Sequence, residues 1–371
     1  MTVLRPEANP RTANSYAEAQ AMSSRRLGFT VTRACPLRCA HCSVSAGPEL
    51  GATTFDTHFA RRVVDQLEEL WEADVLFLDF TGGEPTLAPN FVRAVSTAGK
   101  SVGMTSGMVT AAHWAATPQQ ADRFITRFSG VDNWDISTDV YHLPFVPVDR
   151  VEVAFRTLTD RGKHPLVRIA RHEAMTDEDA KLIDHVHAFA GDNIAFQSVG
   201  PVGRAADIFM DVPVTRERAG LDACPTTGPL VKVTGEVSPC CSSLSYADFS
   251  HPLMLGNAFS DRLVDIMSRW RVHPLLQTIR LWGFGVVLDW LRDEGVDDMY
   301  RRVLRHRACE LCVQLLKDSE LADWAMRHAS TFAHRVKLAH ALKTRFDEHW
   351  LDEDLRREAA ELLEPAAARR T

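Results

Sequence analysis

The chain alternates strand-like runs with helix-like stretches, and this alternation limits the folds that it can adopt. The strand-like runs are at residues 27–32, 75–80, 101–106, 133–138, 166–171 and 193–198. After the second run their starts lie roughly 30 residues apart, which is the length of a βα unit. Strands that alternate with helices form a parallel sheet, because parallel neighbours need a crossover connection. Six units are too few for a closed eight-stranded barrel, so the pattern predicts an α/β fold with an open, partial (βα)6 barrel.

The stretch between the first two runs shows the helical half of the repeat. Its apolar residues recur every three or four positions, which places them on one face of a helix: Phe55, Phe59, Val63, Leu67 and Leu70. In a barrel of this kind the reactive groups lie at the carboxyl ends of the strands. The residues that follow each predicted strand are therefore the candidates for a functional site.

Three of the eight cysteines of the chain follow the first predicted strand, separated from it by only two residues. Cys35, Cys39 and Cys42 have the spacing C-x3-C-x2-C. Three thiolates can hold three corners of a [4Fe–4S] cluster and leave one iron without a protein ligand. A zinc site with His41 as a further ligand, or a set of disulfides, would use the same residues.

Composition argues against the disulfides. The 371 residues are 45% hydrophobic and 25% charged, with no apolar stretch near the roughly 18 residues of a membrane span. The amino-terminal segment lacks the apolar core of a signal peptide, so we expect a cytoplasmic protein, in which thiols stay reduced. A net charge of −7 indicates no nucleic-acid or membrane partner.

Motifs follow the later predicted strands as well. They are TGGEP (81–85), TSG (105–107), STD (137–139) and SVGPVGRA (198–205), which we place at the ends of the second, third, fourth and sixth strands. Together with the cysteine triad, these motifs resemble the radical S-adenosylmethionine (SAM) superfamily as far as about residue 205. The resemblance implies a [4Fe–4S] cluster whose free iron chelates SAM. It also implies a low-potential electron donor of the flavodoxin or ferredoxin type, and reductive cleavage of SAM to a 5′-deoxyadenosyl radical.

The resemblance implies SAM contacts from several strand ends, made by Gly82, Gly83, Glu84, Ser137, Asp139, Arg168 and His41. The glycine motif and its glutamate would hold the amino group of SAM. The residues at 137 and 139 would approach the ribose or the methionine part, and Arg168 the carboxylate. His41 stands where many members carry Tyr or Phe, and it would pack on the adenine.

The remaining cysteines resemble the shortened SPASM module that is called the twitch domain. That module encloses an auxiliary [4Fe–4S] cluster between a β-hairpin, here at 230–241 with its turn at 234–235, and a later C-x2-C pair. The resemblance implies four ligands: Cys224, Cys240, Cys309 and Cys312. A structural zinc site would accept the same thiolates. Cys241 would point away from its neighbour Cys240, either into the core or toward the barrel mouth as a hydrogen-atom donor.

These features predict four segments: a flexible arm (1–24), the radical SAM barrel (25–210), the auxiliary-cluster domain (211–316) and a helical extension (317–371). The expected enzyme abstracts hydrogen from a natural-product intermediate of sugar or aminocyclitol type and epimerises or oxidises it. An alternative is a maturase that epimerises or cross-links residues of a ribosomally made peptide. A third hypothesis, from a different functional class, is a zinc-binding adaptor without catalytic activity.

Overall fold

The computed structural model describes residues 16–51, 53–171, 175–200, 202–208, 223–224, 226–241, 243–246, 249–295 and 308–363. Its eight-stranded sheet has the order β6-β5-β4-β3-β2-β1-β7-β8. Six parallel strands form the barrel: β1 (Arg26–Thr32), β2 (Phe77–Gly82), β3 (Thr105–Thr110), β4 (Asn133–Thr138), β5 (His164–Arg171) and β6 (Ile194–Ser198). The sheet ends at β6 and β8 and does not close within the described residues. The predicted α/β class and partial (βα)6 barrel are confirmed.

The third strand begins four residues later than predicted. Residues up to Ser101 belong to helix α4 (Pro89–Ser101), and Gly103 then turns the chain with a φ of +96°. This turn packs so closely on Trp71 that a side-chain carbon at position 103 would lie 3.0 Å from the indole ring. The TSG motif therefore opens β3, and Thr110 is the residue at its carboxyl end.

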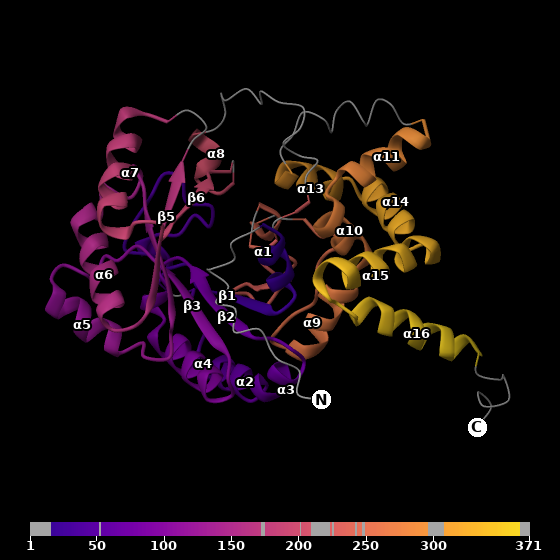
Figure 1. Ribbon diagram of the computed structural model, residues 1–371, viewed down its shortest axis with the longest axis horizontal. Helices are drawn as coiled ribbons and strands as arrows, with labels where there is room; N and C mark the ends of the chain where they lie inside the picture. Colours follow the sequence, from indigo (N-terminus) through magenta and orange to yellow (C-terminus); the bar gives the residue numbers. More distant parts are fainter. Residues whose placement is uncertain are drawn as a thin grey trace.

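Helices cover the outer face of the barrel strands (Figure 1). They are α2 (Thr57–Val64), α3 (Leu67–Glu72), α4, α5 (Pro118–Thr126), α6 (Val148–Asp160), α7 (Asp177–Ala190) and the short α8 (Ala205–Ile208). Helix α2 begins after Asp56, whose carboxylate accepts the Phe59 N–H. Phe55 precedes this helix, yet all five residues of the predicted apolar face lie in the core.

A β-hairpin continues the sheet beyond β1. Strands β7 (Leu230–Val231) and β8 (Val237–Ser238) pair antiparallel, and Gly235 turns between them with a φ of +86°, as predicted. Strand β7 also pairs parallel with β1, with Gly28 opposite Leu230. The barrel and the following cysteine-containing region therefore share one sheet.

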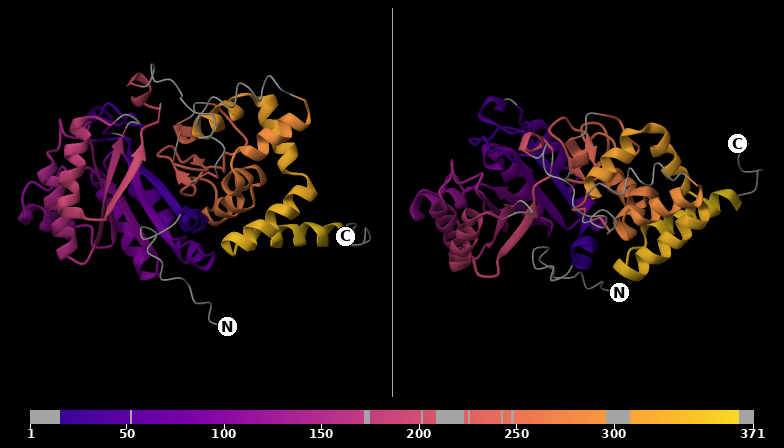
Figure 2. Two further views of the ribbon diagram at one scale, coloured as in Figure 1. Left: turned by 45° about the horizontal axis from the view of Figure 1, so that its top comes forward. Right: turned by 90° about the horizontal axis from the view of Figure 1, so that it is seen from above.

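The later helices gather on the side of the sheet away from α5, α6 and α7 (Figures 1 and 2). They are α9 (Leu263–Val272), α10 (Pro274–Trp282), α11 (Gly285–Asp293), α13 (Ala308–Lys317), α14 (Ser319–Ala329), α15 (Phe332–Phe346) and α16 (Trp350–Leu363). The last three form the predicted helical extension. None of the described helices combines the length and the apolar character that a bilayer crossing requires.

Helix α1 (Tyr16–Ser23) lies within the predicted flexible arm, and the arm therefore does not reach residue 24. The buried Gln20 amide anchors this helix, because it donates to the carbonyls of Cys224 (3.1 Å) and Arg280 (2.7 Å). Residues 1–15 of the predicted arm, and the predicted domain boundary at 210–211, lie outside the described residues.

Candidate active site

A cavity of about 830 Å³ occupies the barrel lumen and its mouth. Its wall includes the three cysteines of the first loop, all seven residues predicted around SAM, and Cys241. Residues at the ends of the six barrel strands thus meet residues that follow the hairpin. The cavity contains enough polar and titratable groups to hold a cofactor and to orient a second molecule beside it.

The cysteine loop is held by its own backbone. Cys42 donates its N–H to the Cys39 carbonyl (3.3 Å), and Cys35 donates its N–H to Gly47 on the returning chain (3.1 Å). The Leu37 N–H points at the Cys35 sulfur (3.4 Å). Burial raises the pKa of the Cys35 thiol to about 12, although this N–H lowers it. An ionised sulfur here therefore requires a nearby positive charge such as iron.

The loop after β6 locks onto the cysteine loop. Arg204 donates its Nε–H to the Cys39 carbonyl (3.0 Å) and its backbone N–H to the Cys42 carbonyl (3.1 Å). Gly203 has a φ of +61°, and a side-chain carbon there would lie 2.6 Å from the Cys42 oxygen. The close approach of the two loops therefore depends on a glycine at this position.

The TGGEP motif clamps the end of β2 to the residues before the cysteine loop. Gly83 donates its N–H to Thr32 (2.7 Å), and Glu84 donates its N–H to Ala34 (2.8 Å). At Gly83 a side-chain carbon would lie 2.7 Å from the Ala34 carbonyl carbon. Gly82 has a φ of +128°, which L side chains rarely adopt. Both glycines are thus needed for the two strand ends to touch.

The Glu84 carboxylate is only 1% exposed and is surrounded by donors. It accepts from the hydroxyls of Thr86 (2.7 Å) and Thr110 (2.9 Å) and from the Ala111 N–H (3.1 Å), with His113 at 3.5 Å. Burial alone raises the pKa of Glu84, but the bonds from His113, Ala111 and Thr86 outweigh it and lower the pKa. This carboxylate joins the ends of β2 and β3, a role that spacing alone did not indicate.

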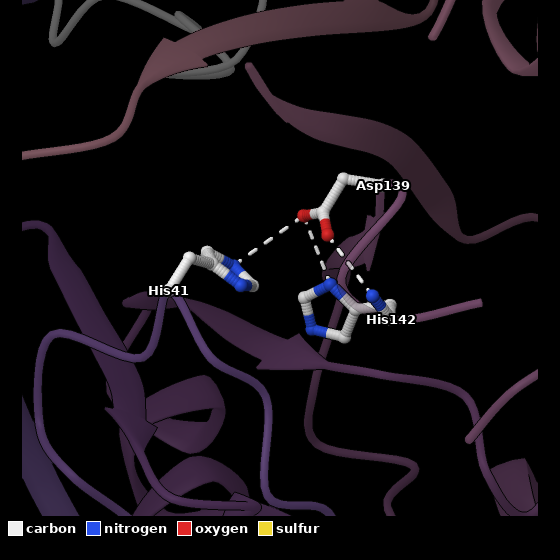
Figure 3. Close-up of side chains that lie close together, drawn as sticks. All are labelled: His41, Asp139 and His142. Carbon is white, nitrogen blue, oxygen red and sulfur yellow. Dashed lines mark hydrogen bonds and ion pairs between the residues drawn. The ribbon is translucent and has the colours of Figure 1, made fainter. Parts of the chain in front are cut away.

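Asp139 lies between two imidazole rings (Figure 3). Its Oδ2 is 2.9 Å from His142 Nδ1 and 3.4 Å from His41 Nε2. Its Oδ1 accepts the backbone N–H of Tyr141 (2.9 Å) and of His142 (3.0 Å). His41 stacks on the Tyr141 ring at 4.8 Å. Burial lowers the pKa of His142, but the nearby Asp139 and Cys39 raise it to about 10.

Two ion pairs lie deeper in the lumen. Arg168 binds Asp135 on the neighbouring strand through Nη2 (2.6 Å) and Nε (3.0 Å), and Arg26 binds Asp79 (2.8 Å). The charge of Asp135 raises the pKa of Arg168, and Cys241 and Asp79 contribute as well. Arg168, predicted to meet the SAM carboxylate, thus already has a carboxylate partner within the protein.

A second group of thiols forms behind the hairpin from Cys224, Cys240, Cys309 and Cys312. Burial raises the pKa of Cys312 well above its usual value, and the charges of the other three thiols add to this effect. The pKa of Cys224 is raised by burial and by the charges of Cys240, Cys309 and Cys241. Cys240 lies in the hydrophobic core, and Cys224 and Cys312 pack against it. Cys309 and Cys312 lie in the first turns of α13.

Cys241 points the other way. Cys240 belongs to the core, whereas Cys241 is exposed, lines the cavity and contacts the Thr227 hydroxyl at 2.9 Å. Tyr246 also lines the cavity, and it interacts with Cys241 and with Ser43 of the cysteine loop. Sequence reasoning assigned no site role to Tyr246 or to His142. Only the proximity of His142 to the STD motif could have drawn attention to it.

Comparisons with known proteins agree with this site. Residues 29–174 match the family model of the radical SAM superfamily. Mycofactocin maturase MftC of Mycobacterium tuberculosis is 26% identical over 209 residues, which are 52% of this chain and 49% of that protein. The chain thus spans about half the length of the curated relatives it matches.

Solved structures with a similar arrangement include SuiB of Streptococcus suis bound to the precursor peptide SuiA. The similarity covers 71% of this chain and 70% of that one, with 14% identity and a TM-score of 0.48. BtrN in complex with AdoMet and 2-DOIA is similar over 66% of this chain and 81% of its own, with 17% identity and a TM-score of 0.35.

The family match includes β1 to β5 and the loops that follow them. It contains the C-x3-C-x2-C triad and the glycine motif at 82–84, and both line the cavity. Residues 29–174 of the chain thus match the radical SAM superfamily, and the motifs within that match line the cavity.

Proposed function

We propose that this chain is a radical SAM maturase with two [4Fe–4S] clusters, which acts on a residue of a peptide. The observation that carries the enzyme class is the single cavity lined by three thiols of one loop and by residues from successive strand ends. The peptide substrate is supported by the similarity to mycofactocin maturase. The match to the superfamily implies the first cluster and SAM, whereas the second cluster is part of the proposal.

The first cluster would be held by Cys35, Cys39 and Cys42. The fit rests on their donor set: three thiols of one short loop line one cavity, and a backbone N–H already faces one of the sulfurs. When bound, cluster and SAM supply one-electron cleavage of SAM to methionine and a 5′-deoxyadenosyl radical. The protein orients the target C–H bond and excludes water.

All seven residues predicted around SAM line the cavity, and five of them divide into two groups by the hydrogen bonds of their side chains. Gly82, Gly83 and Ser137 line the cavity and would face SAM. The carboxylates of Glu84 and Asp139 are each about 1% exposed and already accept several hydrogen bonds. We assign these two carboxylates to shaping the SAM pocket from behind.

The auxiliary cluster would be held by the four thiols behind the hairpin. Buried, mutually close thiolates are unfavourable without positive charge, which iron supplies as it displaces the protons. Four protein ligands would leave no open iron, which suits electron transfer. A structural zinc ion would satisfy the same ligands, and metal analysis separates the two.

Metal content tests the class. Protein reconstituted without oxygen should contain about eight irons, and the variant with Cys35, Cys39 and Cys42 all changed to Ala about four. That variant should no longer form 5′-deoxyadenosine from SAM and dithionite. Cleavage of SAM that survives in the triple variant would refute the class, and zinc at the second site would refute the auxiliary cluster.

The substrate test uses two panels of compounds in one assay. Short peptides, including those encoded beside the gene, are compared with aminocyclitols and amino sugars. Mass spectrometry detects loss of two hydrogens or uptake of one solvent deuterium. The lumenal pairs Arg168–Asp135 and Arg26–Asp79 favour the small polar molecule as the second candidate, since they offer charged partners inside the barrel. Product from that panel alone would overturn the peptide assignment.

The role of Cys241 distinguishes epimerisation from oxidation as the proposed reaction. As a hydrogen donor, its S–H bond breaks while a C–H bond forms on the substrate radical, and the thiyl radical then takes one electron from the low-potential donor and one proton from water. The variant Cys241→Ala should then still consume SAM but deliver no inverted, deuterium-labelled product. Normal turnover of this variant, without deuterium in the product, would instead indicate oxidation, in which the substrate radical would lose one electron to the proposed auxiliary cluster and one proton to solvent.

A further inference from the structure

Three side chains that can bind a metal ion gather at the edge of the cavity (Figure 3). They are His41 in the cysteine loop, and Asp139 and His142 in the segment that follows β4. One ligand atom from each residue lies within 4.8 Å of the other two. All three residues line the cavity, so an ion can reach them from there.

The Asp139 carboxylate has one oxygen that is bonded and one that is not. Its Oδ1 accepts the backbone N–H groups of Tyr141 and His142, at 2.9 and 3.0 Å, which fixes the plane of the carboxylate. Its Oδ2 is buried and has no hydrogen-bond partner among the described residues. The same holds for His142 Nδ1, although this nitrogen lies only 2.9 Å from Oδ2. Buried polar atoms in folded proteins are normally satisfied, and one ion bound to both atoms would satisfy this oxygen and nitrogen together.

The spacing of the ligand atoms fits a first-row metal ion. Such an ion binds imidazole nitrogen and carboxylate oxygen at about 2.0–2.2 Å, which sets two ligand atoms about 3.0–3.4 Å apart. Oδ2 of Asp139 lies 2.9 Å from His142 Nδ1 and 3.4 Å from His41 Nε2. The two histidines need only a small turn of the His41 ring to complete the set. A metal binds this ring at its edge, so one face can still stack on Tyr141 and the other can still pack on the adenine of SAM.

From this geometry we propose that His41, Asp139 and His142 form a mononuclear site for a divalent metal ion, Zn²⁺ or Fe²⁺, distinct from both groups of thiols. Two imidazoles and one carboxylate are a donor set that both ions accept, with coordination positions left for water. The bound ion ties the cysteine loop to the end of β4, because His41 belongs to that loop and the other two ligands follow that strand. The inference goes beyond the proposed function and does not depend on it.

The test counts metal in protein whose thiols are already occupied. Reconstituted protein is dialysed without oxygen against Zn²⁺, and in a second arm against Fe²⁺, and bound metal is measured by mass spectrometry. Wild type should hold about one ion per chain beyond the cluster iron, which acid-labile sulfide counts. Asp139→Asn should hold no such ion at the same concentration, because its amide oxygen can still accept the two N–H groups while its nitrogen cannot bind the metal. His142→Phe should lose the ion as well.

Two controls separate this inference from its alternatives. His185→Phe, on the exposed face of α7, should bind metal as wild type does, and zinc should raise the thermal midpoint of both but not that of Asp139→Asn. Zinc held by the four thiols behind the hairpin would persist in Asp139→Asn, so failure of the auxiliary cluster is distinguishable from failure of this inference. Equal metal content in wild type, Asp139→Asn and His142→Phe would leave a plain ion pair at this place and overturn the inference.

Discussion

The contact between the TGGEP motif and the cysteine loop can be tested by adding a single carbon. In Gly83→Ala the new Cβ would lie 2.7 Å from the Ala34 carbonyl carbon and 2.9 Å from the Arg33 carbonyl carbon. These neighbours are backbone atoms that also hold the motif through hydrogen bonds, so they cannot move without disturbing Cys35. Overpacking of this kind costs about 1–3 kcal/mol, and the rigid neighbours place this site near the upper value.

A loss of about 3 kcal/mol should lower the thermal midpoint by about 6–12 °C for a unit the size of the barrel. Iron bound by the cysteine loop should fall as well. The matched control is Gly51→Ala, on an exposed turn whose nearest heavy atom to a new Cβ is 4.0 Å away. Scanning fluorimetry and iron analysis of both variants provide the measurement. A Gly83→Ala protein as stable as the control would refute the argument from close packing.

Three further changes have defined outcomes. Glu348→Leu leaves the buried Arg280 guanidinium without its carboxylate partner and should lower the free energy of unfolding, measured in urea, by about 3–5 kcal/mol. The double variant with Arg280→Met should recover most of this loss. Burial lowers the pKa of His251 to about 4, below its value of about 6.5 in the unfolded chain, so wild type should lose stability as the pH falls from 7 to 4. The His251→Gln variant should lose less stability over that pH range. Stability curves that run parallel with pH for wild type and variant would contradict this expectation. Arg204→Met removes the side-chain hydrogen bond to the Cys39 carbonyl and should speed the loss of iron to a chelator. An unchanged rate of iron loss would count against a role of Arg204 in holding the cysteine loop.

Much of the barrel could be predicted because its strands carry their own signals. The run at 133–138 coincides with β4, since its residues are buried on both faces and flanked by polar turns. The hairpin turn at Gly235 was equally visible, because only glycine readily takes its positive φ. Placing Cys35 after β1 needed only the carboxyl-end rule for parallel sheets.

The parts that escaped prediction depend on contacts between distant segments. The third strand was placed too early because residues 101–104 are apolar enough to resemble a strand, while the strand itself begins with small polar residues. The partners of Glu84 depend on the pairing of β2 with β3, which brings the ends of the two strands together and lets the Thr110 hydroxyl donate to the carboxylate. Likewise, no local pattern indicates that a two-residue strand such as β7 would pair with β1.

The pairing of β7 with β1 has a consequence for how the chain is made. Gly28 leaves the ribosome early, whereas its partner Leu230 follows about 200 residues later, or about 10–40 s at ordinary rates of synthesis. During that interval β1 has one unpaired edge, and such an edge readily accepts foreign strands. When Leu230 is synthesised, the thiols of the first loop have already left the ribosome, whereas Cys312 has yet to be synthesised. Nascent chains should therefore need protection at β1 and, if the protein holds the two proposed clusters, should be able to receive them in sequence, the barrel site first.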